Sequence, residues 1–109
     1  RSRLVYVTPE RLARPEYLEL LAKTGASLIV VDEAHCISQW GHDFRPAYLA
    51  LRHAIHALGR APVVALTATA TPQIRDDVVA QLGMQDPLVV NTGVLRRNLV
   101  FEVSRTPNE

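Results

Sequence analysis

The chain has 109 residues, the size of one domain with one hydrophobic core. Its 12 basic and 11 acidic residues give a net charge of +1, so charge alone does not indicate a nucleic-acid partner. No apolar run approaches the roughly 20 residues that cross a bilayer, and a single cysteine excludes an internal disulfide. The composition therefore favours a globular protein of a reducing compartment, with the cytoplasm as the default.

Short β-branched segments alternate along the chain with segments of helical period. This alternation predicts an α/β fold, in which helices flank a parallel sheet. Buried strands are expected at residues 4–7, 28–31, 63–66 and 88–90. Each of these segments is apolar throughout, as expected of strands that are covered on both faces of the sheet.

Three helices are expected between these strands. The first, residues 15–23, begins at a proline and stops before Gly25. The second spans residues 47–58. The third has Thr71 as a plausible N-cap, followed by a proline, and continues to Gly83.

Two irregular segments interrupt this pattern. Residues 41–46 fit neither a helix nor a strand, so we expect a loop that packs near the end of the strand at residues 28–31. After Gly93 a polar joint at residues 96–98 precedes an expected strand at residues 99–103. We therefore expect a domain boundary here, dividing residues 1–93 from residues 94–109.

Two adjacent carboxylates, Asp32 and Glu33, follow the expected strand at residues 28–31. Ligands bind at the carboxyl ends of strands in open parallel sheets. One carboxylate can hold a magnesium ion there, while its neighbour orients or deprotonates an attacking water. A bare Asp-Glu pair is also compatible with an ordinary solvated strand end, so the residues around it must decide.

Aromatic and basic side chains follow the two carboxylates within a few positions. Trp40, Phe44 and Arg45 have the side-chain types that stack on or clamp single-stranded nucleic acid. Trp40 is also compatible with a core anchor, but its neighbours have neither helical nor strand period, which favours the surface. Phe44 is equally compatible with a nucleic-acid contact and with a plug that holds the loop.

The sequence Asp-Glu-Ala-His at residues 32–35 is the motif II box of superfamily-2 helicases. Its continuation, Cys-Ile-Ser-Gln-Trp-Gly-His-Asp-Phe-Arg-Pro, closely resembles the aromatic-rich loop of RecQ-type DNA helicases. Residues 6–12 resemble motif Ib, and residues 65–71 resemble motif III. Residues 94–99 resemble a family junction, although Arg97 stands where the family usually has proline. The resemblance covers nearly the whole chain.

This resemblance implies the fold of the first RecA-like motor domain, a parallel sheet of the P-loop NTPase type flanked by helices. No G-x-x-x-x-G-K-[ST] sequence occurs in the chain, so the sheet is expected to be incomplete, without the phosphate-loop strand. Residues 94–109 would form the interdomain joint and the first strand of the second RecA-like domain. Any zinc site would lie in parts of the parent protein outside this chain.

The resemblance also implies roles for single residues. Asp32 would coordinate the magnesium of Mg-ATP, Glu33 would act on the hydrolytic water, and His35 would link the nucleotide site to the loop. Further residues would meet DNA or relay its presence: Gln39, Trp40, His42, Phe44 and Arg45 in the loop, Thr8, Glu10 and Arg11 in the motif Ib stretch, and Thr67 and Thr69 in motif III.

The implied function is that of a 3′-to-5′ DNA helicase acting on chromosomal DNA in recombination and repair. It would couple Mg-ATP hydrolysis to translocation on single-stranded DNA and to duplex unwinding, with ATP and single-stranded or partially duplex DNA as partners and no membrane. The alternative is a non-catalytic DNA-binding or interaction module derived from such a motor. A superfamily-2 motor acting on RNA is disfavoured by the aromatic-rich loop.

Several other side chains offer metal-ligand atoms but lack the paired short spacings of zinc sites: His35, Cys36, His42 and Asp43. His53 and His56 stand three positions apart on the second expected helix, where a solvated helix face is the favoured interpretation. The Cys36 thiol is more simply read as a small buried residue after a strand end than as a site of modification. The threonines of motif III also suit a helix cap.

Overall fold

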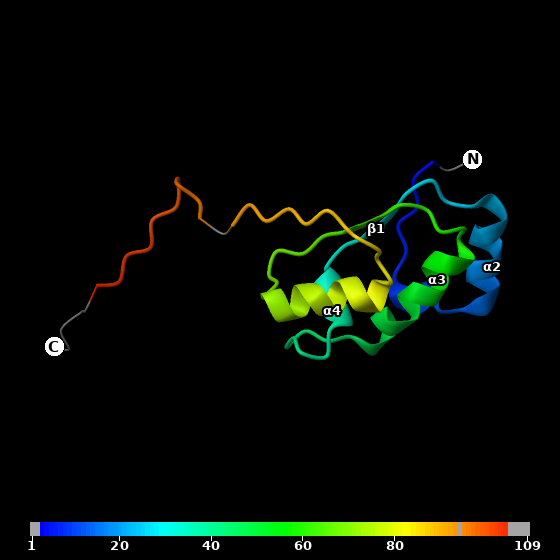
Figure 1. Cartoon of the computed structure of the whole chain (residues 1–109), viewed down its shortest axis with the longest axis horizontal. Coiled ribbons are helices and arrows are strands. Elements are labelled where there is room, and N and C mark those ends of the chain that lie inside the picture. The colour runs from blue at the N-terminus through cyan, green and yellow to red at the C-terminus, as the bar shows by residue number, and fades with distance from the viewer. Residues whose placement is uncertain (1–2, 94, 105–109) are drawn as a thin grey trace.

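The computed structural model describes residues 3–93 and 95–104. Helices pack beside a short parallel sheet, and an extended C-terminal segment runs away from this body (Figure 1). The predicted α/β class is confirmed. In chain order the described elements are α1 (Pro9–Leu12), α2 (Pro15–Thr24), β1 (Ile29–Val31), η1 (Ala34–Ile37), η2 (Pro46–Ala50), α3 (Leu51–Ala57), β2 (Val63–Ala65) and α4 (Pro72–Leu82), where η denotes a 3-10 helix.

The sheet consists of β1 and β2, which run parallel with Val30 opposite Val64. Strands were expected at both places, and both are confirmed within one residue at each end. The pairing continues past β1, because Leu66 N–H donates to the Val31 carbonyl over 2.9 Å and Ala34 N–H donates to the Leu66 carbonyl over 2.9 Å. The chain that leaves β1 is therefore fixed against the chain that leaves β2.

One face of this sheet is covered by helices and the other faces solvent. Val31 is buried, whereas Val30 and Val64 are 53% and 40% exposed. The expectation of two covered faces is thus not met among the described residues. Alternate residues of a strand point to opposite faces, so a single layer of helices can cover only every second side chain.

Three expected strands are wrong for the described structure. Residues 4–7, 88–90 and 99–103 have no strand conformation, and most of their apolar side chains are exposed. A strand exists only where its backbone N–H and C=O groups pair with a neighbour. These segments find no such neighbour in the described part of the chain, whatever their apolar pattern.

The helices follow their sequence signals more closely. The α2 helix ends at Gly25, whose φ of 74° a glycine adopts without a steric cost. The α4 helix begins after Thr71, whose side chain accepts a hydrogen bond from Ile74 N–H over 3.3 Å. Both ends were predicted, because caps depend on residues close in sequence.

The second helix, expected at residues 47–58, has the right position, but its first turn is a 3-10 helix instead of an α-helix. Residues 46–50 form the 3-10 helix η2, and only Leu51–Ala57 are α-helical. Tyr48 N–H donates to the Arg45 carbonyl over 3.0 Å, the three-residue spacing of a 3-10 turn. The short helices α1 and η1 were not predicted at all.

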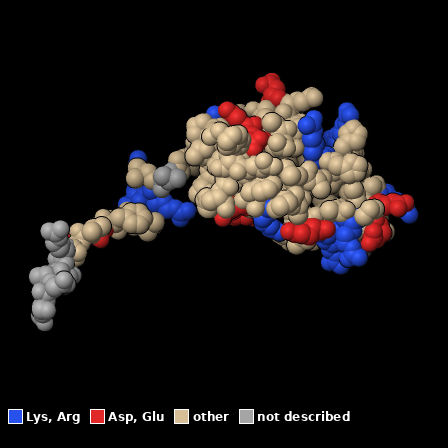
Figure 2. Space-filling view, turned by 90° about the horizontal axis from the view of Figure 1, so that it is seen from below, with Lys and Arg blue, Asp and Glu red and all other residues tan. Residues whose placement is uncertain are grey.

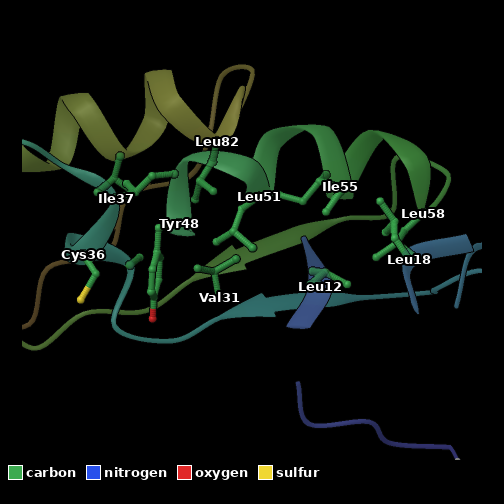
Figure 3. Close-up of a cluster of buried hydrophobic side chains, with 13 residues drawn as sticks. Leu12, Leu18, Val31, Cys36, Ile37, Tyr48, Leu51, Ile55, Leu58 and Leu82 are labelled. Carbon is green, nitrogen blue, oxygen red and sulfur yellow. The ribbon is translucent and has the colours of Figure 1, made fainter. Parts of the chain in front are cut away.

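A single hydrophobic core lies between the covered face of the sheet and the helices (Figure 3). Every element except β2 contributes a buried residue, and β2 adds the partly buried Val63 and Ala65. The buried apolar residues are Leu12, Leu18, Val31, Ala34, Cys36, Ile37, Tyr48, Leu51, Ala54, Ile55, Leu58, Val78 and Leu82. The buried Ala34 follows the acidic pair directly, and Cys36 and Ile37 come two residues later, so the core itself fixes the position of the site.

The C-terminal segment makes little contact with this body. Its described residues, 95–104, are all exposed and contain neither helix nor strand. The expected boundary between residues 1–93 and 94–109 falls beside residue 94, which lies outside the described residues, as do residues 105–109. In the described ranges no helix has the length and apolar character needed to cross a membrane.

Candidate functional site

The acidic pair lies where β1 ends and the chain turns into η1. Asp32 Oδ1 accepts a hydrogen bond from Glu33 N–H over 2.8 Å. Glu33 itself has φ 51° and ψ 41°, the left-handed region that side chains other than glycine seldom occupy. Both residues remain exposed. The sequence predicted the pair but not this backbone conformation.

His35 is buried directly below the acidic pair. Its Nδ1 lies 2.7 Å from Thr67 Oγ1, which belongs to the chain leaving β2. Its Nε2 lies 3.4 Å from Glu33 Oε2 and 3.4 Å from Asp43 Oδ2. The imidazole thus contacts the acidic pair, the segment after β2 and the loop that follows η1. The role of His35 as a link between a nucleotide site and the loop stays a prediction.

The threonines after β2 serve different purposes. Thr67 contacts His35, and its Oγ1 also accepts a hydrogen bond from Thr69 N–H over 3.3 Å. This bond folds the chain back on itself after the strand. Thr71 instead caps α4. The structure therefore brings Thr67 into contact with His35 and Thr69 into contact with Thr67, while the interpretation as a helix cap holds for Thr71.

The loop between η1 and η2 projects its aromatic residue into solvent. Arg45 N–H donates to the Cys36 carbonyl over 2.8 Å, which closes the loop at its base. Trp40 is 69% exposed, so the core-anchor interpretation of this residue is wrong. Gln39 is also exposed, whereas Phe44 is half-buried. The loop thus offers an exposed indole to solvent.

Arg45 forms an ion pair with Glu10 of α1. The pKa of Glu10 is lowered by a backbone hydrogen bond first and by the Arg45 guanidinium second, and the pKa of Arg45 is raised by its bond to Glu10. The guanidinium also lies 5.3 Å from the centre of the Tyr48 ring. Both partners were expected along the DNA path, and the structure shows them bound to each other, tying the loop to α1.

Tyr48 is a site residue that the sequence did not reveal. Its hydroxyl donates to the Asp32 carbonyl over 3.3 Å, so it ties η2 to the end of β1. Figure 3 shows the Tyr48 ring among the buried side chains. Burial of the ring raises the pKa of this hydroxyl, which stays protonated and able to donate. No spacing in the sequence connects Tyr48 with Asp32, because the contact arises only when η2 packs beside β1.

The other residues of the expected motif Ib stretch act within α1. Thr8 is the N-cap, and its Oγ1 accepts a hydrogen bond from Arg11 N–H over 3.2 Å. The Arg11 guanidinium lies 5.1 Å from the centre of the Tyr17 ring. Neither side chain reaches the acidic pair, so a nucleic-acid contact of Thr8 and Arg11 stays a prediction.

Metal-ligand side chains are scattered rather than gathered. Across residues 3–93 and 95–104, no group of three or more His, Cys, Asp or Glu residues is arranged to hold a metal ion. His53 and His56 are exposed on α3, and Arg60 Nε donates to His56 Nδ1 over 3.2 Å. Cys36 is buried, as expected, and burial raises the pKa of its thiol, so the thiol remains protonated.

Charge on the surface is mixed rather than gathered by sign. On the face shown in Figure 2, basic side chains lie close to acidic ones at one end of the body. This agrees with the net charge of +1. Any attraction for an anionic polymer must therefore come from the placement of a few groups, as the sequence suggested.

Comparison with known proteins places these features in a family context. Residues 1–78 match the protein family described as "DEAD/DEAH box helicase". The ATP-dependent DNA helicase RecQ of Bacillus subtilis (strain 168) is 47% identical over 108 residues, which cover 98% of this chain and 18% of that protein. The ATP-dependent DNA helicase Q5 of Rattus norvegicus is 49% identical over 108 residues, covering 94% of this chain and 11% of that protein.

A third relative is the probable ATP-dependent DNA helicase RecS of Bacillus subtilis (strain 168). It is 46% identical over 103 residues, which cover 94% of this chain and 21% of that protein. The chain thus spans about a fifth or less of the length of these relatives.

Proposed function

Because this chain belongs to the DEAD/DEAH box helicase family and has the expected resemblance to RecQ-type helicases, we propose that it is part of an ATP-dependent DNA helicase. Residues 1–93 are the later part of the first RecA-like domain, whose sheet is completed by further strands. Residues 94–109 are the joint and the first strand of the second RecA-like domain. The protein couples Mg-ATP hydrolysis to 3′-to-5′ translocation on single-stranded DNA and to duplex unwinding in recombination and repair.

The observation that carries this proposal is the contact set of His35. The Nε2 atom of this buried imidazole lies 3.4 Å from Glu33 Oε2 of the acidic pair and 3.4 Å from Asp43 Oδ2 in the loop of Trp40. A motor needs its nucleotide site and its DNA site to respond to each other. The loop carries an exposed indole suited to base stacking, and it lies one side chain away from Glu33. This proximity supports a coupled ATP and DNA site.

The residues at the strand end fit a magnesium-bound nucleotide. Magnesium prefers oxygen ligands, and Asp32 keeps one carboxylate oxygen free after Oδ1 has accepted the Glu33 N–H. When bound, magnesium neutralises charge on the phosphate oxygens of ATP. Asp32 would hold that ion directly or through water. Glu33 would orient the attacking water and accept its proton.

The loop and its surroundings would form the DNA side of the site. Trp40 would stack on a base, with Gln39, His42 and Phe44 beside it. Arg45 is engaged with Glu10, so its contact with a phosphate would require exchange of that ion pair. Thr67 and Thr69 would transmit the position of His35 to the segment after β2. The segment Thr8–Arg11 would lie along the DNA backbone.

Substituting Glu33 tests the hydrolytic half of the proposal. In the full-length protein, Glu33→Gln should leave ATP binding largely intact and reduce hydrolysis by about 100-fold or more, since general-base catalysis contributes roughly 100- to 10,000-fold. Steady-state turnover and equilibrium binding of radiolabelled ATP give the two readouts.

Glu19→Gln is the matched control, because Glu19 is an exposed residue of α2 outside the site. It should behave as wild type. Undiminished turnover in Glu33→Gln would contradict the role of Glu33 and would favour the alternative of a non-catalytic module.

A further inference from the structure

The peptide group that joins Asp32 to Glu33 is held by side chains at both of its polar ends. Its N–H, which belongs to Glu33, donates to Asp32 Oδ1 over 2.8 Å. Its carbonyl, which belongs to Asp32, accepts a hydrogen bond from the Tyr48 hydroxyl over 3.3 Å. The plane of this peptide group therefore depends on a residue of η2 that lies 16 positions further along the chain.

The present orientation of this peptide group is the one that strains Glu33, whose φ of 51° lies in the left-handed region. Rotation of a peptide plane changes ψ of the residue before it and φ of the residue after it. A half-turn of this plane would give Glu33 a negative φ, which suits residues other than glycine. The same rotation would turn the Asp32 carbonyl away from Tyr48 and the Glu33 N–H away from Asp32 Oδ1. The two hydrogen bonds therefore oppose relief of the strain.

Tyr48 is the rigid member of this pair of hydrogen bonds. Its side chain is packed in the core and the residue is only 6% exposed, whereas Asp32 is exposed. Packing holds the Tyr48 ring in one rotamer, so its hydroxyl is in place before the peptide group meets it. Burial also raises the pKa of the hydroxyl, which therefore keeps the hydrogen that it donates.

We propose that Tyr48 is a positioning residue that holds the Asp32–Glu33 peptide group in the strained orientation that ATP hydrolysis requires. With this hydrogen bond intact, both carboxylates leave the end of β1 in one geometry, suited to a magnesium ion and to the attacking water. Without the hydroxyl, the peptide group rotates and relieves the strain, and both carboxylates are displaced because the rotating plane lies between them. This inference rests on the proposed function of Asp32 and Glu33.

The first test is a crystal structure of the full-length Tyr48→Phe protein without nucleotide. Phenylalanine keeps the buried ring and removes only the hydroxyl. We expect the Asp32 carbonyl to point away from position 48 and Glu33 to adopt a negative φ. A peptide group that keeps its wild-type orientation would contradict the inference, whatever the activity of the variant.

The second test is ATP hydrolysis by the same variant. We expect kcat to fall by about tenfold, which is within the size of one hydrogen bond. Equilibrium binding of ATP in EDTA should stay within about twofold of wild type, because the acidic pair acts on the ion and the water and not on the nucleotide itself. An unchanged kcat would contradict the inference, and so would a loss of ATP binding in EDTA that matches the loss in kcat.

Tyr17→Phe is the matched control, because it also removes one phenolic hydroxyl, from a half-buried residue of α2 outside the site. It should leave kcat, ATP binding and the thermal unfolding midpoint unchanged. Equal losses of kcat in Tyr17→Phe and Tyr48→Phe would show a general effect of hydroxyl removal and would overturn the inference. Failure of the proposed function has a different signature, namely a wild-type protein that hydrolyses no ATP or a Glu33→Gln variant with undiminished turnover.

Discussion

Glu33 holds the least favourable backbone conformation in the site. A residue other than glycine in the left-handed region costs on the order of 1–3 kcal/mol and persists only where its surroundings enforce it. Asp32 Oδ1 holds the Glu33 N–H, and the bond from Ala34 N–H to the Leu66 carbonyl fixes the next residue. The strained turn places Glu33 Oε2 3.4 Å from His35 Nε2.

The ion pair between Glu10 and Arg45 makes stability depend on pH. A backbone hydrogen bond and, second, the bond to Arg45 lower the pKa of Glu10 in the folded chain. The ionised carboxylate therefore stabilises the fold above the ordinary glutamate value of 4.5, and this stabilisation is lost as pH falls through the lowered pKa. Glu10→Gln should therefore lower the thermal unfolding midpoint at neutral pH. The difference between wild type and variant should vanish in acid. Thermal unfolding of the 109-residue chain across pH measures both.

Glu19→Gln is the matched control, because it removes an exposed carboxylate of α2 that takes no part in the site. Glu16→Gln is unsuitable, because Glu16 forms an ion pair with Arg14. Glu19→Gln should leave the unfolding midpoint nearly unchanged at every pH. A midpoint difference for Glu10→Gln that persists unchanged in acid would mean that the ion pair is not its origin.

At this scale the sequence revealed chemistry better than contacts. The acidic pair and the exposed position of Trp40 were predicted, since residue types at short spacing carry that information. The contact of Asp43 with His35 and that of Tyr48 with Asp32 were not predicted, because packing brings the partners together. Arg45 was correctly placed in the loop. Its ion pair with Glu10 was not predicted, because the two residues lie 35 positions apart and no sequence pattern relates them.

The element that supports the loop is α4. A Cβ atom added to Gly41 would lie 3.6 Å from Ile74 Cδ1, so the loop passes directly over the first turns of this helix. That turn is fixed by the Thr71 cap, which holds Ile74 N–H. The Thr71 cap therefore fixes the first turn of α4, and this turn supports the loop that carries Trp40.

Removing the cap should destabilise this support. Thr71→Ala leaves the Ile74 N–H without its side-chain acceptor, and loss of an N-cap costs about 0.5–2 kcal/mol in the free energy of unfolding. Urea unfolding of the chain, followed by far-ultraviolet circular dichroism, measures this change as a lower denaturation midpoint.

The matched variant is Thr71→Ser, which keeps the hydroxyl and is an equally good N-cap. It should unfold within a few tenths of a kcal/mol of wild type. If serine destabilised as much as alanine, the hydroxyl of Thr71 would not be the source of the stability.

Helices and strands differed in how far the sequence predicted them. The ends of α2 and α4 followed from local signals, a proline or threonine at the start and a glycine at the end. Residues 4–7 and 88–90 have equally good strand patterns, yet form no strand, because strand formation depends on a neighbour and not on the segment itself. The strands β1 and β2 form because each has the other beside it.

At the scale of the whole molecule, the described residues form a sheet that helices cover on one face only, with the acidic pair at the end of β1. The open face shows Val30 and Val64, and an open groove of about 1110 Å³ lies between α3, β2 and the segment after α4. Parallel sheets are normally covered on both faces. The acidic pair, His35 and the loop nevertheless have defined positions, because the core on the covered face of the sheet holds the chain on either side of them.

The central claim is that the loop of Trp40 transmits DNA binding to the hydrolytic site. The most direct measurement is ATP hydrolysis by the full-length protein with and without single-stranded DNA, for wild type, Trp40→Ala and Trp40→Phe. Because Trp40 is 69% exposed, its truncation should spare the basal rate. We predict that Trp40→Ala loses DNA stimulation and that Trp40→Phe, which keeps a stacking ring, retains part of it. Equal stimulation of wild type and Trp40→Ala would contradict the account.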